Sequence, residues 1–162
     1  MWVRTASERD LAEIRSLLVT TWHDTYDRIY GVDKVTEITD NWHSIAALKP
    51  RLTQPGSEFV VADSGERICA VAFASLKDGR VIDLHQLYVL PDAQGKGAGS
   101  LLMHEIIDSF PEARRVRLEV EETNAQAIAF YQNKGFVEVG RTANCGQAES
   151  GLPALILERS LD

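Results

Sequence analysis

The sequence predicts a single α/β domain of mixed type over residues 1–162, with a central, mostly antiparallel mixed sheet of six to seven strands flanked by about four helices. Short apolar runs bounded by turn residues indicate strands. Longer segments whose apolar residues recur every three or four positions indicate helices. The resulting order is strand, helices, three antiparallel-style strands, helix, strand, helix and two strands. A chain of 162 residues is long enough to bury a substantial core.

The first elements are a short strand and a long helix. The run W2-V-R-T5 predicts the strand, and Ser7 is placed as the helix N-cap with Asp10 three residues on. The helical stripe contains Leu11, Ile14, Leu18, Trp22 and Tyr26, and it changes from aliphatic to aromatic along its length. We expect this region to end at Gly31, followed by one helix over about 40–48 that stops before Pro50.

The middle and the end of the chain alternate between strands and helices. Strands are predicted over 58–62, 67–75 and 81–90, separated by the turns D63-S-G-E66 and K77-D-G-R80. A helix follows, with Ala98, Leu102 and Ile106 on its buried face. After a strand over 116–120, T123-N-A-Q126 predicts a capping box and Gly135 predicts the C′ position of the next helix. The last strands are predicted over 136–139 and 155–158.

Composition limits the classes of function. The net charge of −7 disfavours nonspecific nucleic-acid binding. Cys69 and Cys145 form neither a disulfide framework nor a zinc spacing, and Cys69 lies in an apolar run where we expect burial. The four histidines share no metal-ligand spacing, so no metal site is predicted. No apolar stretch approaches membrane-span length, and the N-terminus lacks signal-peptide features, so we expect a cytoplasmic protein.

Three alternating glycines, Gly95, Gly97 and Gly99, stand between a predicted strand and a predicted helix. They match neither the P-loop nor the G-x-G-x-x-G dinucleotide fingerprint. A glycine-rich turn that leads into a helix presents backbone N–H groups and the positive end of the helix dipole to an anion, most often phosphate. Gln94 and Lys96 add possible side-chain donors. The alternative is a plain crossover loop, for which one glycine would suffice.

The segment L87-Y-V, Pro91 and Q94-G-K-G-A-G99 resembles the acyl-CoA pyrophosphate motif of the GNAT superfamily, and N124-A-Q-A-I-A-F-Y131 with N133-K-G-F136 resembles its second motif. The resemblance implies acetyl-CoA as donor, a primary amine as acceptor and direct attack through a ternary complex. The donor-binding residues that it implies are Leu87, Tyr88, Val89, Gln94, Gly95, Lys96, Gly97, Ala98, Gly99, Ser100, Asn124, Ala127 and Phe130. An oxyanion donor is expected in the backbone at Val89 or its neighbours.

Amine acetylation also requires proton transfers. Asn124, Ala127 and Tyr131 share one helix stripe, which leaves Tyr131 as either an acid or a core aromatic; the resemblance favours the acid that protonates the departing thiolate. Asp83 and His85 alternate on one strand face and are base candidates, directly or through water. Glu119 is a third candidate, because a glutamate there resembles the arrangement in protein N-terminal acetyltransferases of bacterial ribosomal type.

Trp22 and Tyr26 are candidates for the wall of the acceptor pocket, with ordinary core packing as the alternative. Two other classes of protein compete with the enzyme: a non-catalytic acyl-CoA-binding regulatory module with the same fold, and a nucleotide-binding protein, which the failed templates disfavour. The sequence specifies neither the acceptor amine nor the oligomeric state, for which relatives suggest a homodimer. The loop over 143–151 is expected at the pocket or at an interface.

Overall fold

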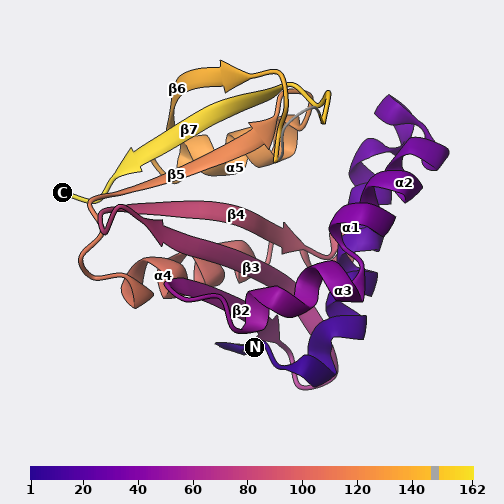
Figure 1. Ribbon diagram of the computed structural model, residues 1–162, viewed down its shortest axis with the longest axis horizontal. Coiled ribbons are helices and arrows are strands. Elements are labelled where there is room, and N and C mark those ends of the chain that lie inside the picture. Colours follow the sequence, from indigo (N-terminus) through magenta and orange to yellow (C-terminus); the bar gives the residue numbers. More distant parts are fainter. Residues whose placement is uncertain (147–149) are drawn as a thin grey trace. The chain divides into compact units, whose positions relative to one another are not determined.

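The computed structural model describes residues 1–146 and 150–162, and over these residues the fold is a mixed sheet with helices (Figure 1). The sheet has seven strands in the order β1-β2-β3-β4-β5-β7-β6. The pairing is antiparallel for β1 with β2, β5 with β7 and β6 with β7, and parallel for β4 with β5. The predicted fold class, a mostly antiparallel mixed sheet, is confirmed.

The chain divides into two compact units, and strands β3 (Ile68–Lys77) and β4 (Val81–Val89) run through both of them. The first unit comprises residues 1–73 and 86–109. It contains β1 (Trp2–Thr5), η1 (Glu8–Asp10), α1 (Leu11–Tyr30), α2 (Val32–Trp42), α3 (Ile45–Leu48), η2 (Lys49–Leu52), β2 (Ser57–Asp63), η3 (Pro91–Ala93) and α4 (Ala98–Ser109). The second unit comprises residues 74–85 and 110–162, with β5 (Arg115–Glu121), α5 (Ala125–Asn133), β6 (Val137–Thr142) and β7 (Ala154–Ser160).

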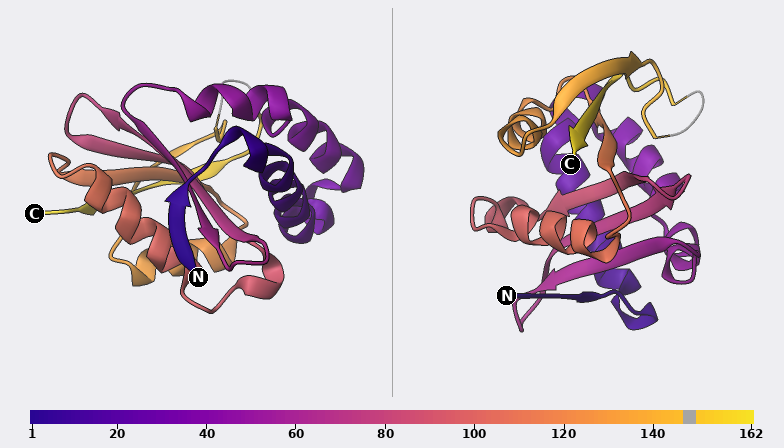
Figure 2. Two further views of the ribbon diagram at one scale, coloured as in Figure 1. Left: turned by 90° about the horizontal axis from the view of Figure 1, so that it is seen from below. Right: turned by 90° about the vertical axis from the view of Figure 1, so that its left-hand side faces the viewer.

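In the first unit, α1 buries the aliphatic part of its predicted stripe against β2 and β3. Ile14 and Leu18 share one core cluster with Phe59, Val61 and other strand residues. Because side chains alternate along a strand, Val60 and Ala62 point to the other face, and α4 contacts β1 and β2. Cys69 is buried, as expected for a small hydrophobe in an apolar run. Figure 2 shows both layers of helices beside the strands.

The start of α1 is fastened to β1 through Asp10. The Ser7 backbone N–H donates to Asp10 Oδ2 at 2.8 Å, as the capping-box pattern predicts. Arg4 donates two further hydrogen bonds to the same carboxylate, at 2.8 and 3.0 Å. The Arg4 guanidinium, followed by the two Ser7 donors, holds the pKa of Asp10 well below its usual range.

The prediction for residues 32–56 was wrong in one respect. In place of one helix over about 40–48, α2 begins directly after Gly31, which has φ +87°, and a second helix, α3, follows a break at His43. Ser44 caps α3 by accepting a hydrogen bond from the Ala47 N–H at 3.1 Å. The α-helix itself ends at Leu48, before Pro50, as predicted. The chain continues into η2, whose first turn accommodates Pro50 because a missing N–H costs nothing there.

In the second unit, β5 carries Val116, Leu118 and Val120 on its buried face. The C-terminus of α5 has the predicted glycine geometry: Gly135 has φ +90°, and the Phe136 N–H donates to the Tyr131 carbonyl at 3.0 Å. Its N-terminus differs from the prediction, because Asn124 is the N-cap and accepts from the Ala127 N–H at 3.2 Å. Thr123 instead bonds the buried carboxylate of Glu121.

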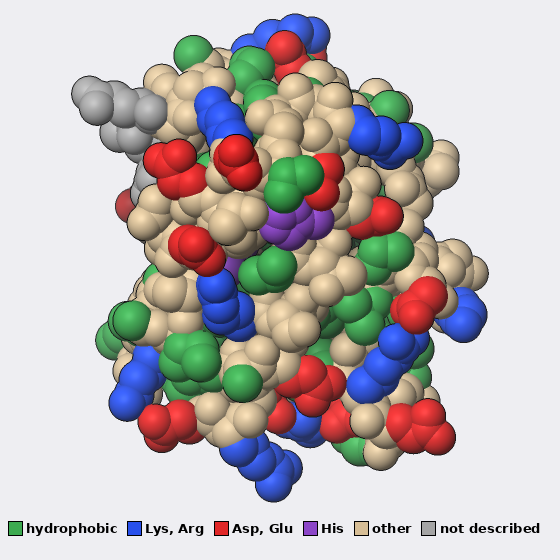
Figure 3. All heavy atoms as spheres, turned by 90° about the vertical axis from the view of Figure 1, so that its right-hand side faces the viewer, with side chains coloured by type: hydrophobic (Ala, Val, Ile, Leu, Met, Phe, Trp, Pro, Cys, Tyr) green, Lys and Arg blue, Asp and Glu red, His purple; other side chains and the backbone are tan. Residues whose placement is uncertain are grey.

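Two further properties concern the charges on the surface and the apolar character of the helices. On the face shown in Figure 3, acidic and basic side chains are interspersed. Among the described residues, no helix combines the length and the apolar character needed to cross a bilayer.

Candidate active site

The glycine loop connects η3 to α4 in the first unit. Gly95 has φ +77° and Gly97 has φ +87°, a backbone region that side chains disfavour. A Cβ atom at either position would meet no heavy atom within 4 Å, so the space in front of both glycines is open. Gly99 differs, because it is buried in the first turn of α4. Two of the three glycines therefore shape the loop, and the third belongs to helix packing.

This loop leads into the N-terminus of α4, where backbone N–H groups and the helix dipole favour an anion. The Leu101 N–H donates to the Gly97 carbonyl at 3.0 Å, which makes Gly97 the residue from which the α4 ladder starts. The N–H groups of Ala98, Gly99 and Ser100 precede that first helical bond and have no acceptor within the helix. Gln94 Nε2 donates to the Val89 carbonyl at 3.2 Å and so ties the loop to the end of β4. Lys96 is exposed beside it and adds a positive charge.

The α5 stripe lies in the second unit. Asn124 caps the helix, Ala127 is half-buried one turn later, and Tyr131 is buried with 8% of its surface exposed. The Tyr131 ring packs edge-on against Phe130 at 5.3 Å and Phe136 at 5.5 Å between centroids. The packing supplies the core contacts that a structural tyrosine would have, and it also fixes the ring that would carry the proposed acid.

The three base candidates lie on one face of the second unit's strands. Asp83 is opposite Arg117 in the parallel register of β4 and β5. His85 and Glu119 follow Asp83 and Arg117 by two residues, and residues two apart share a strand face. His85 Nε2 lies 2.7 Å from Ser75 Oγ, so the imidazole is held by a hydroxyl.

Glu119 also makes a contact that the sequence did not suggest. Its Oε2 accepts a hydrogen bond from the Gly146 N–H at 3.2 Å and so fastens the segment after β6. Cys145 beside it donates its N–H to the Leu152 carbonyl at 2.7 Å. Burial, and then the charges of Glu119 and Glu121, raise the pKa of the Cys145 thiol to about 12. The expectation for 143–151 falls partly outside the described residues, which omit 147–149.

An aromatic cluster in the first unit contains both predicted acceptor-wall residues. Trp22 contacts Tyr26 at 4.7 Å, Trp42 and His43 at 5.7 Å each, and Tyr88 at 6.5 Å between ring centroids. Trp22 and Tyr26 are both buried, so they belong to the hydrophobic core as well as to the aromatic cluster.

His43 belongs to this cluster and was not singled out from the sequence. It is buried together with Val35 and Thr39, and these three residues recur at helical spacing immediately after Gly31. That four-residue spacing was the signal that could have found both α2 and the buried histidine.

His43 has polar and charged neighbours. Arg51 donates to Gln86 Oε1, and a guanidinium has only donors, so the Gln86 amide nitrogen faces His43 Nδ1 at 3.3 Å. Burial, and then the charge of Arg51, lower the pKa of His43 to about 3. Among the described residues, His43 Nε2 and Trp22 Nε1 have no hydrogen-bond partner.

Comparison with known proteins identifies the class to which this fold and loop belong. Residues 11–136 match the Acetyltransferase (GNAT) family, and the chain belongs to that family. An uncharacterized N-acetyltransferase of Mycobacterium tuberculosis (strain H37Rv) is 32% identical over 129 residues, which cover 78% of this chain and 83% of the relative. N-alpha-acetyltransferase RimI of the same strain is 35% identical over 99 residues, 59% of this chain and 61% of the relative.

The solved structures agree on the fold. PaiA N-acetyltransferase from Thermoplasma acidophilum, in complex with coenzyme A, has a TM-score of 0.83 at 21% identity, covering 98% of this chain and 97% of that one. The ribosomal-protein-S18-alanine N-acetyltransferase of Escherichia coli has a TM-score of 0.72 at 19% identity, covering 99% and 93%. The predicted family is thus confirmed.

Proposed function

We propose that this chain transfers an acetyl group from acetyl-CoA to a primary amine by direct attack within a ternary complex. The observation that carries the proposal is the loop of Gly95 and Gly97, whose positive φ angles and open front suit a pyrophosphate at the start of α4. Membership of the GNAT family supports the same reaction.

The chain's own residues have four tasks in this reaction, and three of them concern the donor. The segments 87–89 and 94–100, with Asn124, Ala127 and Phe130, are proposed to bind and orient the donor, which supplies the acetyl thioester when bound. The backbone at Val89 is proposed to donate a hydrogen bond to the oxygen that becomes negative during attack. Tyr131 is proposed to protonate the departing thiolate, so that the reaction ends with a neutral thiol.

The remaining task is to make the amine nucleophilic. A protonated amine has no lone pair, so the proton must leave before or during attack. His85, Asp83 and Glu119 are proposed as alternative acceptors of that proton, directly or through water. Trp22 and Tyr26 are proposed to wall the acceptor side. Because one relative is named as an N-alpha-acetyltransferase, a peptide α-amine stands beside small amines as the acceptor class to test.

The decisive experiment follows free thiol while the purified chain is incubated with acetyl-CoA and a panel of amines. The panel contains short peptides with free N-termini, the same peptides with blocked N-termini, and simple alkylamines. Thiol release that requires an amine, with an acetylated product in the mass spectrum, supports the enzyme. Saturable CoA binding without turnover across the panel would instead support the regulatory module, and absence of CoA binding would contradict both.

A further inference from the structure

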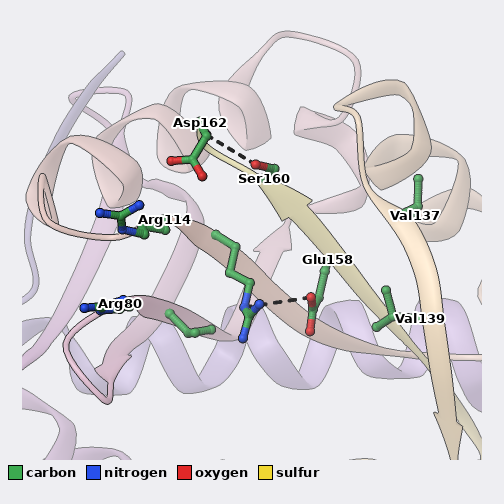
Figure 4. A pocket seen from close by; sticks show the side chains of 9 residues that line it. Arg80, Arg114, Val137, Val139, Glu158, Ser160 and Asp162 are labelled. Carbon is green, nitrogen blue, oxygen red and sulfur yellow. Dashed lines mark hydrogen bonds and ion pairs between the residues drawn. The ribbon is translucent and has the colours of Figure 1, made fainter.

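A groove lies in the second unit (Figure 4). Its lining residues take no part in the proposed acetyl transfer, although two of its strands, β4 and β5, also carry the base candidates. We call it the arginine groove. It has a volume of about 480 Å³, within the range of small-molecule sites. The lining residues that matter here are Arg80, Arg114, Arg115, Glu158, Val137 and Val139.

The backbone holds the basic end of the groove together. Arg80 precedes β4 and Arg114 precedes β5, and the Arg114 N–H donates to the Arg80 carbonyl at 2.7 Å. The Leu161 N–H donates to the Arg114 carbonyl at 2.9 Å. These two hydrogen bonds join three chain segments at one point, so the backbone that carries the Arg80 and Arg114 side chains is held in place.

The carboxylates of the groove leave these two arginines without a partner. Glu158 accepts from Arg117 at 3.1 Å and lies 3.9 Å from Arg115, so its charge is already balanced. Among the described residues, neither Arg80 nor Arg114 has an ion pair or a side-chain hydrogen bond. Asp162 also lines the groove, and within the described part of the chain it forms no ion pair with Arg80 or Arg114.

The opposite end of the groove is apolar. Val137 and Val139, on the edge strand β6, are 62% and 52% exposed. Figure 4 shows them across Glu158 from Arg80 and Arg114. A ligand that spans the groove therefore meets guanidinium donors at one end and two isopropyl groups at the other.

We propose that the arginine groove binds an organic oxyanion, a carboxylate or phosphate monoester carried on a small apolar body. Guanidinium groups match both oxyanions because their fork of N–H donors pairs with two oxygens at once. The valines add apolar surface for the body of the ligand. This site is independent of acetyl transfer, since none of its lining residues has a place in the proposed reaction.

The test uses phenyl phosphate, phenylacetate and inorganic phosphate as calorimetric probes of the intact chain at neutral pH and low salt, with saturating CoA present. We expect saturable binding of phenyl phosphate or phenylacetate, and the difference between them identifies the oxyanion. Arg80→Ala combined with Arg114→Ala should weaken that binding at least tenfold. Arg141→Ala is the matched control, because this exposed β6 arginine pairs with Glu138 and Glu122 outside the groove.

Several outcomes would overturn the proposal. In the first, the wild type binds neither aromatic probe while CoA is bound, so that the arginine groove binds no oxyanion. Equal binding by the double variant and by Arg141→Ala is another. A third outcome would refute the contribution of the valines: inorganic phosphate binds as tightly as phenyl phosphate, and Val139→Ser keeps the wild-type affinity for phenyl phosphate. Melting temperatures of all variants show whether each is folded, and their acetyl-CoA binding should match the wild type.

Discussion

At the scale of the residue, the proposed acid rests on a single hydroxyl. Tyr131→Phe keeps the ring between Phe130 and Phe136 and removes only the proposed proton donor. That loss acts in the transition state, so kcat and kcat/KM should fall together, on the order of 10- to 1,000-fold, while donor affinity holds. Steady-state kinetics and CoA titration on one preparation measure both quantities.

The matched control for this variant is Phe136→Leu. It disturbs the same packing without touching the hydroxyl, so it should lower the melting temperature while each folded molecule turns over normally. Normal turnover in Tyr131→Phe, accompanied by a lower melting temperature, would make Tyr131 a core aromatic and remove it from the reaction.

The three base candidates are separable because they differ in their partners. His85 contacts Ser75, Glu119 holds the Gly146 N–H, and Asp83 lies opposite Arg117. Alanine at the true base should reduce the rate about 10²–10⁴-fold and move the acid limb of the kcat/KM profile. Because of its loop contact, Glu119→Ala can also raise the acceptor KM. pH–rate profiles of the three variants distinguish these effects; three unchanged acid limbs would leave water or bulk deprotonation of the amine.

At the scale of the element, the glycine loop can be tested against a glycine that has the same positive φ angle. Gly97 and Gly31 both have φ +87° and open space around a would-be Cβ. Alanine at either site should cost about 1–3 kcal/mol of stability through backbone strain. Only Gly97→Ala should also weaken CoA binding, by about tenfold or more, which corresponds to roughly 1.4 kcal/mol. Calorimetric titration measures this, and equal CoA affinities in the two variants would refute the loop assignment.

The junction of β1 with the first helical turn gives a prediction for pH. The pKa of Asp10 is depressed in the folded chain, so the carboxylate contributes stability above its unfolded pKa and loses it as pH falls through the folded value. Asp10→Asn should therefore destabilise by about 2 kcal/mol at neutral pH, less than a fully buried pair because Arg4 is partly exposed and keeps Asp63. The difference in melting temperature from wild type should be constant between pH 6 and 8 and shrink below about pH 4.

Asp92→Asn provides the comparison, since the Arg67–Asp92 pair is exposed. That variant should lie within about 1 kcal/mol of wild type. A comparable loss in both variants, or a difference for Asp10→Asn that persists into acid, would show that the Asp10 ion pair is not the source of the stability.

The elements also show where sequence patterns sufficed. Alternation predicted that Asp83 and His85 share one face of β4, and the buried residues Ile82, Leu84 and Gln86 lie on the opposite face. The stripe from Leu11 to Tyr26 predicted the buried face of α1. Both patterns are local consequences of backbone geometry. The loop of Gly95 and Gly97 was predictable for the same reason. The contact between Glu119 and Gly146 joins residues 27 positions apart, and no local period encodes it.

The prediction for the region after Gly31 was wrong for a different reason. Its buried residues Val35, Thr39 and His43 include two polar side chains, which a search for apolar periodicity passes over. The buried His43 contacts Gln86, from a distant strand, through its Nδ1, and Arg51 fixes the orientation of Gln86. Such a polar contact becomes visible only once the strands are placed.

At the scale of the whole molecule, the two compact units should unfold together. Strands β3 and β4 each run through both units, so breaking either unit interrupts hydrogen-bonded strands of the other.

All three tryptophans, Trp2, Trp22 and Trp42, lie in the first unit, so tryptophan fluorescence follows that unit alone. With Cys69 replaced by Ala, the only thiol is Cys145 in the second unit, partly buried in the folded chain. In a urea titration, Cys145 is labelled by a brief pulse of a thiol-reactive reagent. The midpoint of this labelling and the midpoint of the fluorescence change should coincide, as a two-state domain requires.

Distinct midpoints would divide residues 1–162 into two independently folding parts and contradict the single-domain prediction. Repeating the titration with Asp10→Asn sharpens the test, because that substitution lies in the first unit and should shift both midpoints equally only if the units are coupled.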